Sequence, residues 1–512
     1  MRCRNLYSIF LTIQFVLLSS TAHAEHQTNT LTPVQLDSSL PYQVELRPYD
    51  FGQASLPTLH SYAAGEHDGK WVLIAGRTNG LHSFESNSVN NFPPEFQNRD
   101  VWVIDPVSKQ SWSRSLLSPS ASLTTDQVNS LTPANNQFYQ QGDQLYMTGG
   151  YGLYTELPDG TSVNSTFDTL SAIDLPGLVD WVVDGTGSAA ENIRQLSDPI
   201  FSVTGGAMYE MAGRTHLVFG QDFQGNYHPG KNGTYTKQVR SFDIVDDGTT
   251  LAIANESATP QVEAYRRRDL NIFPVLQPDG LGSTEEGLAV LSGVFTETFG
   301  AWTVPVEIDA NGTPTMADPN NPATFKQGMN GYHSAKLGLY SESAGEMHEL
   351  LFGGISLQYY DALTDQIETD DFLPFINDVT SVVIDSAGNY SQHRIGEFPN
   401  ITDLDGNRLR FGANAEFFPA TNIDTFTNEV IKLDALTSET TLGYIFGGIA
   451  TNGPHTRGVP DVLSVGSNTI FEVILTPVPE PSTALLLCLG SLLTSGVTAR
   501  RRSANSQYAG VL

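Results

Sequence analysis

The stretch "LGYIFGGIA" at residues 442–450 is an apolar run that ends in two glycines. An apolar run of this length predicts a buried β-strand, and the glycines predict a tight bend where the strand ends. Five other segments repeat the pattern of an apolar strand running into glycine: "WVLIAGRTNG" (71–80), "QLYMTGGYG" (144–152), "HLVFGQDFQG" (216–225), "LAVLSGVFT" (288–296) and "ELLFGGIS" (349–356). Self-similarity of this kind predicts a repeat architecture.

A second recurring strand follows each of the six glycine strands. The segments are "DVWVID" (100–105), "DTLSAID" (168–174), "VRSFDI" (239–244), "WTVPVEID" (302–309), "DVTSVVID" (378–385) and, in the sixth unit, "TIFEVIL" (469–475). A weaker strand precedes most glycine strands, and another usually follows the second recurring strand. Each unit therefore has four short strands, and the chain is expected to be all-β.

Four short strands, with a Gly-Gly pair ending the second, resemble the kelch repeat of β-propellers. The resemblance covers about residues 42–476 and is degenerate, because only Gly149-Gly150, Gly353-Gly354 and Gly447-Gly448 keep both glycines. The units are spaced by about 60 to 95 residues, against ~50 in kelch proteins, so insertions are expected, one of them at 419–441. The resemblance implies a β-propeller, and the six matching units predict six blades.

The ends of this region predict how the ring closes. The sixth unit stops after its third strand, and "YQVELRPY" (42–49) is an alternating strand with no unit of its own. We expect it to be the outer strand of the last blade, because closure removes sheet edges that would otherwise aggregate. A pair of β-sandwiches is the alternative, and it would need many fewer matching units.

Residues 1–24 have the layout of a secretory signal peptide. Arg2 and Arg4 precede an apolar run from Ile9 to Leu18, and Ala22-His23-Ala24 forms a small-x-small cleavage site. Export is therefore expected, with residues 25–41 as a linker to the propeller.

The C-terminal residues 477–502 have three parts: Pro479-Glu480-Pro481, an apolar segment from about 484 to 497, and Arg500-Arg501-Arg502. They resemble the PEP-CTERM sorting signal of Gram-negative bacteria that make extracellular polysaccharide. The resemblance implies recognition by an exosortase, transient inner-membrane anchoring through a short transmembrane segment, and delivery to the cell surface or matrix. Residues 503–512 would be a cytoplasmic tail. An ordinary tail anchor is the alternative, although a span usually needs ~20 residues.

The net charge and the cysteine content exclude several kinds of partner and site. The net charge is −30, and it becomes −34 when removal of both signals takes away five arginines and one glutamate. Such a surface repels nucleic acid and anionic membranes. The only cysteines, Cys3 and Cys488, lie in the removed segments, so the mature chain is expected to have no disulfide and no thiolate metal site.

The candidate site lies on the face where the loops after the second strands and before the first strands open together. Arginine offers a planar fork for carboxylates, and aromatic rings stack on sugars, so an anionic or polyhydroxylated ligand is expected. The tentative ligand-binding residues are His60, Arg77, Asn79, His82, Tyr151, Gln221, Arg267, Arg268, Trp302 and His333. The alternative is that these side chains only satisfy loop backbone groups. No metal site, cofactor or catalytic motif is predicted.

Two enzyme classes with kelch-like propellers can be compared. Copper-radical carbohydrate oxidases depend on a tyrosine cross-linked to cysteine, so the mature chain cannot use that chemistry. Sialic-acid mutarotases are six-bladed kelch propellers with an acid/base site at the axis. His60, His82 or His333, with Glu297 or Glu416, could serve such a reaction, and the sequence favours no particular pair.

The sequence thus predicts an exported surface or matrix protein that binds glycan or protein in extracellular polymer through its loop-bearing face. A sugar isomerase or mutarotase at the axial pocket and a structural scaffold without a specific ligand are the alternatives. A converging Arg/His pocket would favour a binder or enzyme, and an axis filled with apolar side chains would favour the scaffold.

Overall fold

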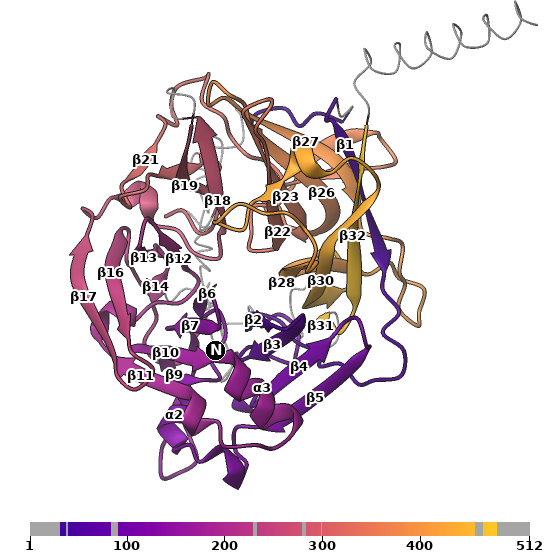
Figure 1. Ribbon diagram of the computed structural model, residues 1–512. Helices are drawn as coiled ribbons and strands as arrows, with labels where there is room; N and C mark the ends of the chain where they lie inside the picture. The colour runs from indigo at the N-terminus through magenta and orange to yellow at the C-terminus, as the bar shows by residue number, and fades with distance from the viewer. Residues whose placement is uncertain are drawn as a thin grey trace, which may run out of the picture.

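The computed structural model describes residues 31–36, 39–82, 91–228, 233–278, 283–297, 300–455 and 464–478. Six sheets stand around one axis, each built from at least four strands (Figure 1). The predicted all-β, six-bladed propeller is therefore confirmed. The predicted sorting signal, including Pro479, Glu480, Pro481, Arg500, Arg501 and Arg502, lies outside the described residues, as does the signal peptide.

In each of the first five blades, four antiparallel strands run outward from the axis in chain order. Blade one holds β2 (Ala63–His67), β3 (Lys70–Ile74), β4 (Asp100–Asp105) and β5 (Gln110–Ser115); blade two holds β6 (Gln137–Gln141), β7 (Gln144–Thr148), β10 (Thr169–Asp174) and β11 (Ile193–Ser197). Blade three holds β12 (Ala207–Met211), β13 (Arg214–Val218), β16 (Val239–Asp246) and β17 (Leu251–Ala258); blade four holds β18 (Asn271–Pro278), β19 (Thr284–Leu291), β20 (Val306–Ile308) and β21 (Pro314–Met316). Blade five holds β22 (Ala335–Ser341), β23 (Glu346–Ile355), β26 (Phe375–Ile384) and β27 (Tyr390–Glu397).

Blade six joins the two ends of the folded chain. It holds β28 (Arg410–Pro419), β30 (Thr440–Thr451), β32 (Ile470–Pro477) and, as its outer strand, β1 (Tyr42–Pro48). β1 is antiparallel to β32, with Tyr42 opposite Pro477 and Pro48 opposite Phe471, and the two lie side by side in Figure 1. The predicted closure of the ring by residues 42–49 is confirmed.

The end of every second strand has the same backbone conformation, whether or not the chain has a double glycine there. Two consecutive residues with positive φ occur in all six blades: Ala75-Gly76, Gly149-Gly150, Phe219-Gly220, Ser292-Gly293, Gly353-Gly354 and Gly447-Gly448. The first glycine is thus replaced by another residue in three blades, while the left-handed bend is kept. The second position is always glycine. In blade two this residue is Gly150, and its N–H donates to Val203 O of blade three (2.8 Å).

The hydrophobic core is divided among the contacts between neighbouring blades. Six clusters of buried apolar side chains fill the six blade–blade interfaces, and the interface of blades two and three, for example, packs Tyr146 and Leu170 against Met208 and Phe242. Each blade is too thin to bury its own faces, so the closed ring supplies the burial.

Additional elements decorate the blades. Three hairpins follow second strands: β8 (Tyr151–Glu156) with β9 (Ser162–Thr166), β14 (Gln221–Asp222) with β15 (Thr234–Tyr235), and β24 (Gln358–Asp361) with β25 (Gln366–Thr369). The described residues also form two α-helices, α2 (Thr125–Ser130) and α3 (Leu175–Val183), and two short strands that pair with blade strands, β29 (Ile431–Lys432) and β31 (Ser464–Gly466). The predicted insertion at 419–441 carries β29, which pairs in parallel with the axial edge of β22.

The N-terminal segment expected as a linker lies against blade five. Thr32 N–H donates to Lys326 O (3.0 Å), Gln35 N–H donates to Gln392 O (2.9 Å), and Arg394 N–H donates to Gln35 O (2.9 Å). The two bonds of Gln35 occupy part of the edge of β27 before the chain enters β1. Within the described ranges, no helix is long and apolar enough to cross a bilayer.

Candidate functional site

Six backbone hydrogen bonds form a closed ring around the axis. Five residues of the ring lie two positions before the first strand of their blade, and the sixth lies within β28. The N–H of each donates to the carbonyl of its counterpart in the preceding blade over 2.7–3.2 Å. We call these residues the axial ring: Ser61, Asn135, Gly205, Asp269, His333 and Asn414. The ring fixes the loops of all six blades relative to one another and separates two cavities on the axis.

The residue types of the axial ring follow from its backbone. Five of its members have φ between +48° and +66°, and His333 is the exception. Glycine adopts this left-handed conformation freely, and Asn and Asp are enriched in it among other residues. Asn135, Gly205, Asp269 and Asn414 therefore fit their conformation, and Ser61 adopts it as well.

The loop-face pocket lies on the side of the axial ring where second strands end, and it encloses about 80 Å³. All six blades contribute to its lining. Six of the ten candidate residues meet here: His60, Arg77, His82, Tyr151, Gln221 and Arg268. The sequence did not single out four further contributors, Phe92, Phe223, Tyr227 and Asp269.

His60 and Arg77 form one side of the loop-face pocket, on neighbouring segments joined by backbone hydrogen bonds. The Arg77 guanidinium donates to Asn79 Oδ1 (3.1 Å) and Pro93 O (3.1 Å) and lies over the Phe92 ring. His60 Nδ1 lies 2.9 Å from Ser61 Oγ. Burial, assisted by the charge of Arg77, lowers the pKa of His60 to about 3, so the imidazole is neutral near pH 7 and Arg77 carries the charge.

An aromatic wall faces this pair. Phe92 packs edge-on against Tyr151 (5.1 Å between ring centroids) and Tyr227 (5.6 Å), and His82 packs edge-on against Tyr227 (4.8 Å). The Tyr151 hydroxyl donates to Gly225 O (2.9 Å) and accepts from Tyr227 N–H (2.8 Å), which joins blades two and three. Rings held by packing and hydrogen bonds offer flat faces for stacking at small entropic cost.

Arg268 forms the opposite side. Its Nε lies 3.6 Å from Asp269 Oδ2, and its guanidinium lies over the Phe295 ring, 5.1 Å from the centroid. Burial raises the pKa of Asp269, although Arg268 opposes the shift. Two guanidinium groups, Arg77 and Arg268, thus border one hollow at the ring.

Four candidate residues lie elsewhere. Asn79 sits behind Arg77 as its hydrogen-bond acceptor, and Trp302 Nε1 donates to Arg266 O (2.8 Å) away from the pocket. Arg267 is fully buried, with its guanidinium donating to Ala264 O and Ser292 O (3.1 Å each), so it supports blade four. The fourth candidate, His333, points to the other side of the ring.

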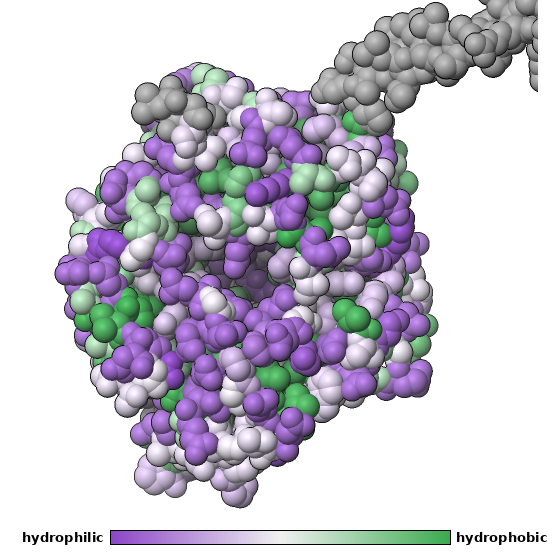
Figure 2. Space-filling model, viewed as in Figure 1, coloured by the Kyte–Doolittle hydropathy of each residue, from purple (hydrophilic) through white to green (hydrophobic). Residues whose placement is uncertain are grey.

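The axial cavity on that other side is larger, about 670 Å³. First strands of all six blades line it, and the insertion closes part of its border through Thr427–Ile431. One face of the molecule is hollowed at its centre and bordered mainly by hydrophilic side chains (Figure 2). The carboxylates on the cavity wall are Glu66, Glu210, Asp269, Glu286, Glu416 and Glu429.

Three titratable side chains meet near the inner end of the axial cavity. His333 Nε2 lies 3.3 Å from Lys336 Nζ and 3.6 Å from Glu416 Oε1. Burial raises the pKa of Glu416 to about 7 against the opposing charge of Lys336, and burial lowers the pKa of His333 to about 3. Near pH 7 the carboxyl can therefore give or take a proton beside a neutral imidazole.

Of the histidines and glutamates that the sequence left open, the structure brings His333 and Glu416 within 3.6 Å of each other. Glu297 is exposed and lines neither cavity. Lys336 was missed, although it lies three residues after His333 on the strand that follows. In the part of the chain that the structure describes, no group of three His, Cys, Asp or Glu side chains could hold a metal ion.

Comparisons with known proteins add little to this geometry. No protein-family model matches the sequence, and no curated protein matches it. Among solved structures, the structure of YjhT aligns over 83% of this chain and 99% of that chain, with 11% identity and a TM-score of 0.41. The fold assignment rests on the six sheets described above.

Proposed function

We propose that this propeller is an exported cell-surface or matrix protein that binds acidic glycan through its loop-face pocket. The convergence of Arg77 and Arg268 on one hollow carries the proposal. Both are cationic side chains held in place by ring contacts, in a protein whose overall charge is strongly negative. A localised positive site on such a surface favours an anionic group over the surrounding face.

The size of the pocket indicates which part of a ligand would enter it. About 80 Å³ suits a carboxylate or another terminal group better than a whole saccharide. A guanidinium binds a carboxylate through two parallel hydrogen bonds, and Tyr227 and Phe92 offer ring faces beside it. The preferred ligand is therefore a uronic or sialic acid residue whose remaining sugar lies across the loop face.

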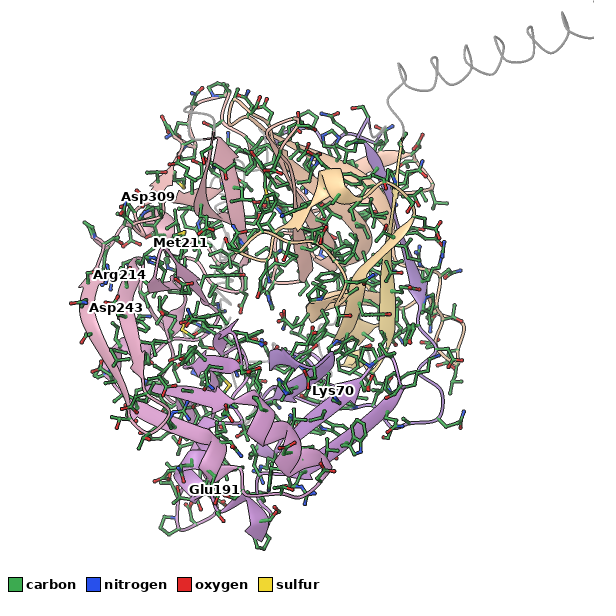
Figure 3. All side chains as sticks on the ribbon, viewed as in Figure 1. Lys70, Glu191, Met211, Arg214, Asp243 and Asp309 are labelled. Carbon is green, nitrogen blue, oxygen red and sulfur yellow. The ribbon has the colours of Figure 1, made fainter. Side chains whose placement is uncertain are left out.

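Binding to a glycan array that includes uronic and sialic acids tests this proposal. We expect saturable binding that is lost in Arg268→Ala and in Arg77→Ala. The matched control is Arg214→Ala, because Arg214 pairs with Asp243 (3.2 Å) on the outer side of blade three, as labelled in Figure 3. Circular dichroism of each variant would establish that it is folded. Absence of binding, or binding that both pocket variants retain, would contradict the proposal and favour the scaffold.

The terminal sequences support the proposed location. An exosortase would recognise Pro479-Glu480-Pro481, with the apolar segment and Arg500-Arg501-Arg502 holding the precursor in the inner membrane. Cell fractionation of the native host, comparing the full chain with one ending at Val478, tests this. Sorting requires that only the full chain reach the surface, and identical distributions would contradict it.

A second candidate function is sugar isomerisation or mutarotation in the axial cavity. The contact between His333 and Glu416 favours it, because ring opening at an anomeric centre needs a proton donor and acceptor close together. Exchange NMR between the anomers of a panel of neutral aldoses would detect the activity. Glu416→Gln should abolish it while Arg268→Ala leaves it unchanged, since Arg268 lies across the axial ring.

A further inference from the structure

Lys336 is the one lysine among the described residues that line the axial cavity. It extends from β22 at the inner edge of blade five. The chain has seven lysines, and Lys109, for comparison, lies exposed at the turn between β4 and β5. An amine enclosed in a cavity large enough for a small molecule differs chemically from an amine in water.

The surroundings of Lys336 favour an unprotonated amine. Burial lowers the pKa of Lys336, and the charge of Glu416 opposes that shift. No described carboxylate oxygen lies within 4.0 Å of its Nζ. The amine lies within hydrogen-bonding distance of His333 Nε2 (3.3 Å), which at neutral pH can accept a hydrogen bond but adds no positive charge. Glu286 on β19 and Glu429 in the insertion face the same cavity.

We propose that Lys336 captures small uncharged aldehydes, including open-chain aldoses, as an imine in the axial cavity. The cavity of about 670 Å³ admits a molecule of this size, and the five acidic side chains on its wall besides Glu416 disfavour anionic aldehydes. This goes beyond glycan binding at the loop face, because it uses a different cavity and needs no ligand there.

The three side chains supply the groups that imine formation needs. The Lys336 nitrogen forms a bond to the carbonyl carbon, and one of its protons moves by way of His333 Nε2 to the carbonyl oxygen, giving a carbinolamine. The protonated Glu416 carboxyl then donates to the hydroxyl, which leaves as water. The nitrogen loses its second proton through His333, which restores the Glu416 carboxyl. One amine and one aldehyde thus give one imine and one water, and no oxidant or reductant is consumed.

Reductive trapping tests this directly on the whole protein. The probe is glycolaldehyde with cyanoborohydride at pH 7.5, and peptide mass spectrometry measures the labelling rate at each lysine. Because burial lowers the pKa of the Lys336 amine, more of that amine is unprotonated at pH 7.5, and we expect labelling at Lys336 to be several-fold faster than at Lys109. Lys336→Arg should remove the fast label, whereas Lys109→Met should leave it intact.

A third variant separates chemistry from simple access. Glu416→Gln keeps the shape of the wall but cannot deliver a proton, so the label at Lys336 should form several-fold more slowly while Lys109 is unaffected. Labelling of Lys336 and Lys109 at equal rates would overturn the proposal, and so would an unchanged rate in Glu416→Gln. The wild-type measurement stands on its own if a variant fails to fold.

Discussion

Gly149→Ala should destabilise the propeller far more than Gly388→Ala, although both glycines have positive φ. Gly149 has φ +65° and ends the second strand of blade two, whereas Gly388 has φ +79° in the turn between β26 and β27. A left-handed conformation costs a non-glycine residue roughly 1–2 kcal/mol, partly offset because alanine has less entropy to lose on folding. This backbone contribution is common to both positions.

The steric contribution separates them. A Cβ on Gly149 would lie 2.0 Å from Val203 O and 2.9 Å from Phe201 O, both in the main chain leading into blade three, while a Cβ on Gly388 would meet nothing within 4 Å. Overpacking against atoms that cannot rotate away costs about 1–3 kcal/mol more. We therefore expect losses of about 1 kcal/mol for Gly388→Ala and about 2–4 kcal/mol for Gly149→Ala.

Urea unfolding followed by tryptophan fluorescence measures both variants against the wild type. Equal losses would refute the reasoning, because they would show that backbone conformation alone, and not the approach of the next blade, requires glycine at the end of the second strand. Ala75 holds the corresponding conformation in blade one with a side chain present, so the backbone by itself is tolerated.

Three further predictions concern buried polar groups. Tyr42→Phe removes the buried bond between the Tyr42 hydroxyl and Ser381 Oγ (3.0 Å), and should lower the free energy of unfolding by about 0.5–1.5 kcal/mol in the same urea experiment. Burial raises the pKa of Glu416 from 4.5 in the unfolded chain to about 7 in the fold. The fold therefore has its full stability from this group below pH 4.5, and it loses that stability as the pH rises through about 7. Glu416→Gln should remove that part of the pH dependence, measured as urea midpoints from acid to neutral pH. Arg267→Lys keeps a positive charge but cannot reach Ala264 O and Ser292 O together, so thermal unfolding should occur at a lower temperature than in Arg268→Lys.

The strand pattern was predictable because each second strand is apolar and ends in a sharp bend. The sequence did not predict that Phe219 and Ser292 would take the positive φ that glycine has at this point in three other blades. A non-glycine residue keeps such a conformation where the surrounding structure favours it, and a single repeat does not encode that surrounding structure. The closing strand was predictable from a count of strands, as the sixth unit lacked one and residues 42–49 had no other partner.

The sequence predicted which face of the propeller carries the candidate site, but not which side chains on that face point into it. Three consecutive arginines show why. Arg266 lies over the Tyr235 ring, Arg267 points into blade four, and Arg268 borders the loop-face pocket. Successive side chains of a loop take directions set by the blade they precede, and no local pattern encodes those directions. The sequence also did not show how far along the axis each side chain lies. His333 was therefore predicted to share a site with His60, although the axial ring separates their cavities.

The axial ring couples the site to the closure of the fold. All six blades contribute to the ring and to the loop-face pocket, and blade six is complete only when β1 pairs with β32. A ligand that touches this pocket therefore binds the closed propeller and not a form in which the last blade has opened. Such a ligand stabilises the closed form by RT ln(1 + [L]/Kd), so a saturating glycan should protect β1 and β32 from hydrogen exchange although neither strand contacts it. Protection confined to the loops around Arg77 and Arg268 would show instead that the pocket forms independently of closure.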